Sequence, residues 1–374
     1  MTKSSTDAPP PAVALVHDWL VRWGGSESVL DSLCAILPDA PIHTLVHRPD
    51  ARTRAVFEDR RVIPTLLDRL PGAGRHYRSA ALLMPAIWRR TCAPATDLVV
   101  SSSHAFCKGV DTRGVTHVCY CHTPPRYLWD LRHEYAGRMM HRLSAPLARY
   151  LQRQDLEAAE RVDHFVANSH FVAERIRRLY GREARVVYPP VDVDRFVPHD
   201  RPRTHFLAGG RLVRYKRVDR AIAAANAGGL PLLVFGEGPD LPRLRAMAGA
   251  TVRFAGACDD GQLLELMQSA IALVFPGVED FGILPVEAQA AGTPVVALAE
   301  GGTLDTVTHQ ATGLLYGEDS VQALLDAMVE ARDQRWRADA CRRNAERFAR
   351  PRFESELRAV LAEFGAPNAQ ASSA

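Results

Sequence analysis

The sequence carries little excess charge of either sign. Its 46 Lys and Arg residues against 43 Asp and Glu residues leave a formal net charge of +3. So small a charge gives little long-range attraction for polyanions, so we do not expect nucleic acid as a partner. Hydrophobic residues at 47% and charged residues at 24% are typical of a folded globular protein.

Long hydrophobic runs are also missing. No apolar run approaches the roughly 18 residues needed to cross a bilayer. The first segment, MTKSSTDAPPPA, is polar and proline-rich and lacks the apolar centre of a secretory signal. We therefore expect a cytoplasmic protein. The polar ends, residues 1–11 and 365–374, are expected to be disordered.

Metal-ligand patterns are equally scarce. The seven cysteines are odd in number and scattered, and CYCH at 119–122 has no second ligand pair at zinc-like spacing. We expect no metal there, and interpret Cys119 and Cys121 as buried strand thiols. A D-x-D pair, Asp192 and Asp194, lies in a proline-flanked segment that favours a turn or helix-capping role over metal binding.

One segment does concentrate charge of one sign. Residues 60–90 contain seven arginines and one acid, Asp68, mixed with the apolar stretches VIPTLLDRL and ALLMPAIW. This pattern suits a surface lying on anionic lipid, which would place the protein at the inner face of the plasma membrane. A solvated helical face with a buried apolar side explains the pattern equally well.

Short valine-rich runs alternate with amphipathic stretches along nearly the whole chain. Runs that are apolar on both faces fit parallel strands covered by helices on each side. The expected strands are 12–16, 96–103, 116–121, 164–169, 185–189, 204–209, 231–236, 251–256, 271–277 and 294–299. The alternation predicts a doubly wound α/β fold.

The segment YPPVDVDRFVPHDRP, 188–202, interrupts this alternation and reads as a linker. We therefore expect two Rossmann-like domains, 12–189 and 200–351. A last helix at about 352–364 is expected to pack back on the first domain. Ligands of such sheets bind beyond the carboxyl ends of the strands, so we expect the site in a central cleft that both domains face.

The stretch PGVEDFGILPVEAQAAG, 276–292, follows an expected strand and predicts a short helix. Proline suits its first turn and Gly292 the position past its end. The free N–H groups of Gly282, Ile283 and Leu284 and the helix dipole favour a bound anion, most plausibly phosphate.

Two carboxylates flank this anion site. Glu287 lies inside the helix, where it could accept hydrogen bonds from ribose hydroxyls. Glu279 precedes the turn, on the other side of the phosphate. Sugar hydroxyls at both ends of a nucleotide sugar would supply the donors that these carboxylates need.

The complementary positive charge lies in AGGRLVRYKRVD, 208–219, after the first strand of the second half. Arg211 can grip a diphosphate with two parallel bonds, and Lys216 adds a point charge. Such charges also stabilise a diphosphate as it leaves. Simple solvation is the plain alternative for either residue alone.

The motifs GGRLVRYKR, VFGEGPDLPRL, VRFAGACDD, EDFGILPVEAQAAGTPVVALAEGG and TGLLY resemble, in order and spacing, the nucleotide-sugar half of retaining glycosyltransferases of family 4. These enzymes have the GT-B architecture of two Rossmann-like domains. In the first half, HDWLVRWGGSESVL resembles the family's glycine loop, and CYCHTPPRYLWD resembles a bacterial branch. That branch contains GDP-mannose-dependent mannosyltransferases of O-antigen and exopolysaccharide assembly.

The resemblance implies a role for each matching residue. Arg211 and Lys216 would hold the donor diphosphate, Glu279 the hydroxyls of the transferred sugar, and Glu287 the ribose. The backbone of Gly282, Ile283 and Leu284 would contact sugar and phosphate. Gly24 and Gly25 would let the first helix approach the phosphate, and His122 would face the sugar.

The resemblance also implies metal-independent, retaining transfer of a hexose, mannose from GDP-mannose, without a cofactor. The acceptor would be a polyprenyl-diphosphate-linked glycan. Asp260 could read guanine, but Asp259 and Asp260 read equally well as helix caps.

Three alternatives remain open. The same fold could use a UDP-sugar or another nucleotide sugar. It could serve a phosphorylase or an epimerase, although the second half has no lysine other than Lys216 for a pyridoxal cofactor. A two-domain sugar-binding protein without catalysis is the alternative from another class.

Overall fold

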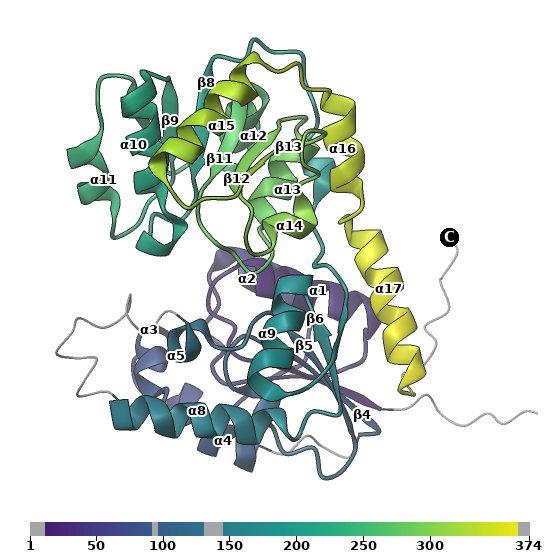
Figure 1. Cartoon of the computed structure of the whole chain (residues 1–374). Helices are drawn as coiled ribbons and strands as arrows, with labels where there is room; N and C mark the ends of the chain where they lie inside the picture. Colours follow the sequence, from purple (N-terminus) through teal and green to yellow (C-terminus); the bar gives the residue numbers. More distant parts are fainter. Residues whose placement is uncertain (1–11, 92–95, 131–144, 366–374) are drawn as a thin grey trace, which may run out of the picture. The chain divides into compact units, whose positions relative to one another are not determined.

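The computed structural model describes residues 12–91, 96–130 and 145–365 (Figure 1). The chain divides into two compact units. The first contains the described residues up to Asn168, Val172–Pro189, and those from Phe353 onward. The second contains Ser169–Phe171 and Pro190–Arg352. The expected disorder of the two chain ends concerns residues that, except for Gly365, lie outside the described ranges.

In the described part of the first unit, seven parallel strands form one sheet in the order β3-β2-β1-β4-β5-β6-β7. The strands are β1 (Val13–His17), β2 (Ile42–Thr44), β3 (Val62–Pro64), β4 (Leu98–Ser103), β5 (Thr116–Cys121), β6 (His164–Ala167) and β7 (Ala184–Val186). The chain order reverses between β1 and β4, which lie side by side.

Helices cover this sheet. The α-helices are α1 (Gly25–Ile36), α2 (Ala51–Phe57), α3 (Ala73–His76), α4 (Met84–Arg90), α5 (Arg126–Trp129), α8 (Ala145–Ala159), α9 (His170–Tyr180) and α17 (Arg350–Glu363). The described part of the first unit also contains three short 3₁₀ turns, η1 (Leu66–Arg69), η2 (Tyr77–Ala80) and η3 (Cys107–Gly109).

Alternate residues of β1 serve two separate cores. Val13 and Leu15 pack in a cluster with residues of α1 and α17, whereas Ala14 and Val16 pack with residues of α4 and α8. Because successive side chains of a strand point to opposite faces, both faces of the sheet must be covered. This explains why the strand sequence is apolar throughout.

The second unit, as far as it is described, contains a sheet of six parallel strands in the order β10-β9-β8-β11-β12-β13. The strands are β8 (His205–Gly209), β9 (Leu232–Phe235), β10 (Val252–Gly256), β11 (Ala270–Phe275), β12 (Val295–Leu298) and β13 (Gly313–Tyr316). Here the order reverses between β8 and β11.

The helices of the second unit follow its strands in the usual alternation. They are η4 (Val193–Arg195), η5 (Arg214–Lys216), α10 (Val218–Gly228), α11 (Leu241–Met247), α12 (Asp260–Gln268), α13 (Ile283–Ala290), α14 (Thr303–Thr306), α15 (Val321–Asp333) and α16 (Ala338–Glu346). Figure 1 shows α10 and α15 on one side of the sheet and α13 and α16 on the other.

The predicted fold class, two doubly wound α/β domains, is confirmed. Each of the ten expected strands forms within a few residues of its predicted position. The strands β2, β3 and β13 were not predicted from the sequence. The first two are only three residues long, too short for a clear apolar run, and β13 begins with a glycine.

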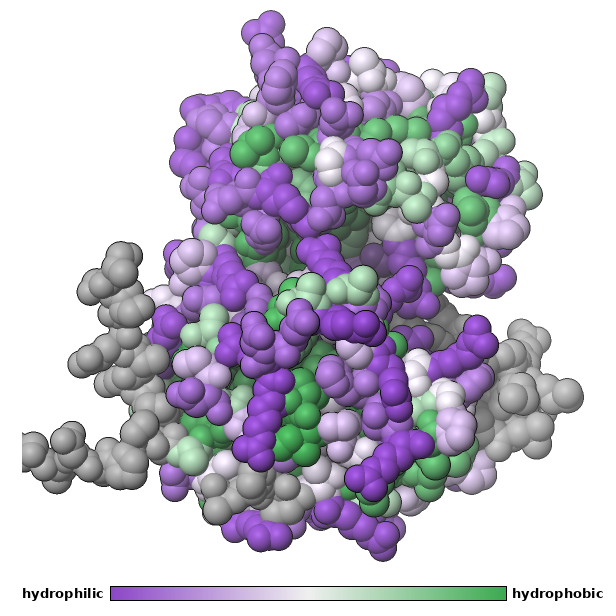
Figure 2. Space-filling view, turned by 180° about the vertical axis from the view of Figure 1, so that it is seen from behind, coloured by the Kyte–Doolittle hydropathy of each residue, from purple (hydrophilic) through white to green (hydrophobic). Residues whose placement is uncertain are grey.

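The surface of the protein is mixed in polarity. On the face shown in Figure 2, apolar side chains lie in small groups between hydrophilic ones. Among the helices that the structure describes, none is long and apolar enough to span a membrane.

Candidate functional site

The candidate residues of the second unit lie on two loops at the reversal of strand order. One loop leaves β8 and carries Arg211 and, in η5, Lys216; the other leaves β11 and carries Glu279. Neighbouring parallel strands whose connections run in opposite directions leave a crevice at their carboxyl ends, where ligands of such sheets bind. The fold therefore brings together Lys216 and Glu279, which are 63 positions apart in sequence.

Glycine allows the two loops to touch. A Cβ atom on Gly277 would lie 2.7 Å from the Cα atom of Lys216. No real Cβ atom approaches backbone that closely, so any larger residue would push the loops apart. The ammonium group of Lys216 depends on this close approach for its position.

Lys216 and Glu279 form an ion pair in this crevice. The Nζ atom of Lys216 lies 3.1 Å from Oε1 of Glu279, and their side chains are 19% and 22% exposed. The contact is an ion pair without the alignment of a good hydrogen bond. Arg211 is exposed and makes no ion pair or side-chain hydrogen bond within the described residues. Both cations can therefore reach an anion at the loop tips.

The N-terminus of α13 supplies the backbone donors. Gly282 precedes the helix with φ of 90°, a left-handed conformation that favours glycine. Within the described chain, the backbone N–H groups of Gly282, Ile283 and Leu284 donate no hydrogen bond. Such unpaired donors at the positive end of a helix dipole form an anion site.

Packing fixes the direction of α13. The side-chain amide of Gln289, inside this helix, donates to the backbone oxygen of Thr306 at 2.8 Å. Asn344 of α16 donates in turn to Oε1 of Gln289 at 2.6 Å. All three residues are buried, so the helix is held by satisfied polar contacts.

Glu287 lies one turn into α13 and is paired with a residue that the sequence reading did not single out. Arg195 of η4 donates from Nη2 to Oε1 of Glu287 at 3.1 Å and from Nη1 to Oδ2 of Asp260 at 2.6 Å. Burial raises the pKa of Glu287 to about 7, and the Arg195 guanidinium only partly offsets that effect. The sequence signal that could have indicated this partner is the arginine in the linker segment DVDRF.

The structure separates the two acids at the start of α12. Asp259 is the N-cap and forms a capping box with Gln262, in which each side chain bonds the other residue's backbone N–H. Asp260 is 53% exposed and pairs with Arg195. The capping interpretation is therefore correct for Asp259, and Asp260 has an ion pair in its place.

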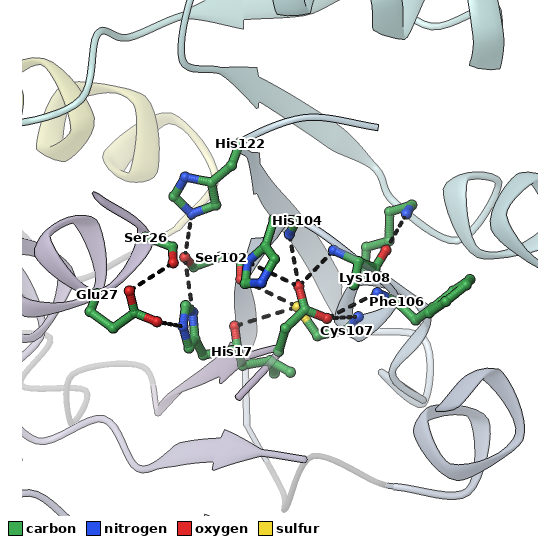
Figure 3. A network of polar contacts seen from close by, with 12 residues as sticks. His17, Ser26, Glu27, Ser102, His104, Phe106, Cys107, Lys108 and His122 are labelled. Carbon is green, nitrogen blue, oxygen red and sulfur yellow. Dashed lines mark hydrogen bonds and ion pairs between the residues drawn. The ribbon is translucent and has the colours of Figure 1, made fainter. Parts of the chain in front are cut away.

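A second polar cluster occupies the equivalent position in the first unit, where the order reverses between β1 and β4 (Figure 3). His17 ends β1, Ser102 lies near the end of β4, and His122 directly follows β5. Ser102 Oγ lies 2.8 Å from Nε2 of His122 and 3.2 Å from Nδ1 of His17. Glu27 of α1 places Oε1 3.5 Å from Nε2 of His17.

A buried carboxylate holds the adjacent loop. Asp18 accepts four backbone hydrogen bonds of 2.7–2.9 Å, from the consecutive N–H groups of residues 104–107. Burial alone would raise the pKa of Asp18, but nearby His104 and these donors lower it below its usual value. His122 is neutral, because burial holds the pKa of its ring well below 6.5.

Gly24 and Gly25 begin α1, as N-cap and first helical residue. A Cβ atom on Gly24 would lie 3.1 Å from Oε2 of Glu27. The same first turn therefore holds a carboxylate, which opposes a second anion there. The N-terminus of α13 is the better phosphate site on this ground.

Possible metal ligands are dispersed. Over the described ranges, no group of three His, Cys, Asp or Glu side chains is arranged to hold a metal ion. Asp194 is 89% exposed and pairs with Arg342, and Asp192 is the N-cap of η4 but makes no capping bond with its side chain. The D-x-D segment is thus part of a turn without a side-chain cap, which is the first of the two expected roles.

The fold is that of the GT-B class of proteins, two Rossmann-like domains in one chain. The crystal structure of HepE from Anabaena, in complex with UDP and glucose, resembles this structure with a TM-score of 0.67. The likeness covers 94% of this chain and 99% of that chain, at 17% identity. At this identity the likeness concerns the fold alone.

Two family models match the sequence, one in each half. Residues 23–195 match Glycosyltransferase Family 4, and residues 194–348 match Glycosyl transferases group 1. Each model matches less than half of the chain, and the two matches follow one another along the sequence.

Curated relatives match over part of their length. D-inositol 3-phosphate glycosyltransferase 1 of Catenulispora acidiphila is 32% identical over 224 residues, 49% of this chain and 53% of the relative. A GDP-mannose-dependent alpha-(1-6)-phosphatidylinositol monomannoside mannosyltransferase of Mycobacterium tuberculosis is 31% identical over 204 residues, 46% of this chain and 53% of the relative. The chain thus spans about half the length of these relatives.

The raised pKa of Glu287 leads to a test of its predicted role. If its ionised form accepts ribose hydroxyls, binding releases the proton of Glu287 and affinity rises with pH. With a pKa near 7, a nucleotide sugar should bind about tenfold more weakly at pH 6 than at pH 8. Calorimetric titration would measure this, with a nucleotide sugar because the terminal phosphate of a free nucleotide titrates in the same range.

Glu287→Gln is the matched control for this titration. It should bind more weakly at pH 8 and lose the pH dependence. An equal pH dependence in both proteins would contradict the assignment of Glu287 to the nucleotide.

Proposed function

We propose that the protein is a retaining glycosyltransferase that transfers mannose from GDP-mannose to a polyprenyl-diphosphate-linked glycan. The synthesis of a bacterial surface polysaccharide is the setting. The observation that carries the proposal is the set of groups that follow β8 and β11. These are the ion pair of Lys216 with Glu279 and the unpaired N–H groups that begin α13, a few residues after Glu279 in sequence. The two glycosyltransferase domains of the chain support the same reading.

Each of these groups has a role in the proposed transfer reaction. Lys216, Arg211 and the N–H groups of α13 neutralise the diphosphate as its bond to the anomeric carbon breaks. Glu279 accepts hydrogen bonds from hydroxyls of the transferred sugar, and Glu287 accepts those of ribose. The acceptor oxygen bonds to the same face of the anomeric carbon and passes its proton to the departing phosphate. This route requires no carboxylate nucleophile and no metal.

The donor is the finer part of the proposal. GDP-mannose is supported by the sequence motifs of the first half and by the mannosyltransferase from Mycobacterium tuberculosis among the relatives. Asp260, at the start of α12, is the residue proposed to meet guanine. UDP-glucose is the rival donor, because the structurally similar HepE is in complex with UDP and glucose.

Turnover of the donor separates these possibilities. We expect the purified protein to release GDP slowly from GDP-mannose, faster than UDP from UDP-glucose, and at an unchanged rate in excess EDTA. Released nucleotide is measured by chromatography. A non-catalytic sugar-binding protein would bind the donor and release nothing. Loss of turnover on chelation, restored by Mg²⁺ or Mn²⁺, would refute the metal-independent mechanism.

The two glutamates should respond differently to substitution. Glu287→Ala should weaken GDP and GDP-mannose by similar factors, because both ligands contain ribose. Glu279→Ala should spare GDP, or strengthen it by freeing Lys216, and should reduce turnover of the intact donor. The measured quantity is the ratio of the two affinities for each variant. A ratio that changes equally in both variants would rule out this division of roles.

A lipid-linked acceptor would require contact with a membrane. The arginine-rich segment has a buried side, formed by Leu67, Tyr77, Met84 and Trp88. It also exposes four leucines: Leu66 at 74%, Leu70 at 55%, Leu82 at 40% and Leu83 at 57%. Exposed leucines among arginines fit the surface of an anionic bilayer. We therefore propose that this surface of the first unit contacts the cytoplasmic face of the plasma membrane.

Vesicle sedimentation tests the membrane contact. The protein should bind phosphatidylglycerol vesicles more tightly than phosphatidylcholine vesicles, and less tightly at high salt. Removing two inserted leucines in Leu66→Ser/Leu83→Ser should weaken binding about tenfold or more. Leu304→Ser, at a leucine of the second unit that is 59% exposed, is the control. Equal losses in both variants would argue against this docking surface.

A further inference from the structure

A continuous row of hydrogen-bonding groups runs from Glu27 to His122 (Figure 3). The row passes from the carboxylate through His17 and Ser102, with spacings of 3.5, 3.2 and 2.8 Å. His17 and Ser102 are fully buried and Glu27 is 4% exposed. His122 is the least buried member of the row, so the row ends at a ring that keeps some solvent access although burial lowers its pKa.

The carboxylate end sets the direction of the row. Burial alone would raise the pKa of Glu27, but the contact with His17 and the charge of His104 lower it, so Glu27 is ionised at neutral pH. An ionised carboxylate accepts hydrogen bonds and cannot donate them. Its Oε2 atom already accepts from the hydroxyl of Ser26 at 3.0 Å. The ring nitrogen of His17 that faces Oε1, Nε2, must therefore carry a hydrogen.

The length of this contact fits a neutral His17 better than a charged one. A bond between an imidazolium and a carboxylate is charge-assisted and about 2.7–2.9 Å long. The observed distance is 3.5 Å. A neutral ring with hydrogen on Nε2 leaves Nδ1 as a bare acceptor. Ser102 then donates its hydroxyl hydrogen to His17, and its oxygen accepts the remaining hydrogen bond from Nε2 of His122.

We propose that Glu27, His17 and Ser102 are positioning residues that hold His122 in the tautomer protonated at Nε2. The Nδ1 atom of His122 is thereby left as an acceptor for a hydroxyl of the carbohydrate substrate. The identity of that hydroxyl rests on the proposed function, whereas the tautomer rests on the hydrogen-bond row alone. A group that only accepts, such as a phosphate oxygen, would meet a lone pair and be repelled. The row therefore selects a polyol hydroxyl at this point.

Ser101, which is next to Ser102 in β4, offers a matched control. Ser101 Oγ lies 2.8 Å from Nε2 of His117, the same distance as between Ser102 and His122. Both serines are in β4, but successive side chains of a strand point to opposite faces. Ser101→Ala thus removes an equivalent buried serine–histidine contact that is not part of the row.

Nitrogen NMR of the histidine rings tests the tautomer directly. Protein labelled with ¹⁵N at the ring nitrogens is examined at pH 8, and the His122 resonances are assigned by their loss in His122→Gln. In the unsubstituted protein Nε2 should be the protonated nitrogen and Nδ1 the bare one. In Ser102→Ala both signals should move toward the average of two tautomers, and in Ser101→Ala they should not move. A protonated Nδ1 in the unsubstituted protein, or unchanged signals in Ser102→Ala, would overturn the proposal.

A second variant covers the case in which Ser102→Ala does not fold. Glu27→Gln replaces the obligate acceptor by an amide that can donate or accept, so it should also mix the tautomers of His122. Circular dichroism verifies the fold of each variant. His122 signals identical to those of the unsubstituted protein in a folded Glu27→Gln would overturn the role of the carboxylate.

Kinetics test the contact with substrate. Losing one positioning hydrogen bond should lower kcat/KM for the nucleotide sugar roughly two- to tenfold in Ser102→Ala, with nucleotide affinity unchanged. Ser101→Ala should keep kcat/KM within twofold. A mixed tautomer with undiminished kcat/KM would overturn the hydroxyl contact of Nδ1. If the unsubstituted protein uses no nucleotide sugar, the proposed function fails, and the NMR result still decides the tautomer.

Discussion

The reversal of strand order in a parallel sheet is the constraint on which both candidate sites depend. In the first unit the reversal falls between the neighbouring strands β1 and β4, and in the second unit between β8 and β11. At each reversal the connections leave neighbouring strands in opposite directions, so their loops cannot cover the strand ends. His17 and Ser102 occupy one of these openings, and Lys216 and Glu279 the other. Both candidate sites thus lie where the topology leaves strand ends uncovered.

Charges in these openings are only partly shielded from each other. Arg195 bridges Asp260 and Glu287, yet the pKa of Glu287 remains raised because burial outweighs its single close cation. Ribose hydroxyls would add the donors that this carboxylate lacks. The ion pair of Lys216 with Glu279 could likewise be replaced by contacts with a ligand. A diphosphate would bond Lys216, and sugar hydroxyls would bond Glu279. The proposed ligand, which carries an anion between two groups of hydroxyls, would therefore supply the partners that these groups lack.

The first unit manages its buried polar groups differently. Asp18 is satisfied by four backbone donors, so its charge fixes a loop and has no spare capacity for a ligand. The neighbouring row from Glu27 to His122 is satisfied as far as Ser102 and ends at an accessible nitrogen. A fully satisfied network makes a site rigid. A row that ends at the surface leaves one group that can bond a ligand. Together they give a fixed ring with a defined hydrogen-bonding direction.

The sequence by itself determined the fold class, because apolar runs alternating with amphipathic helices admit few arrangements other than a doubly wound sheet. It also determined where the helix after Gly282 begins. A glycine followed by a proline in the first turn is a local signal for a helix start. Only the tertiary structure decided the partners. Arg195 reaches Glu287 across 92 positions of sequence, and Ser102 reaches His17 across 85. The short strands β2 and β3 are likewise stabilised by their neighbours in the sheet. Hydrophobic periodicity and helix capping are local patterns, so they can be recognised in the sequence. The direction of a hydrogen bond and the pKa of a side chain depend on groups that meet only when the chain is folded.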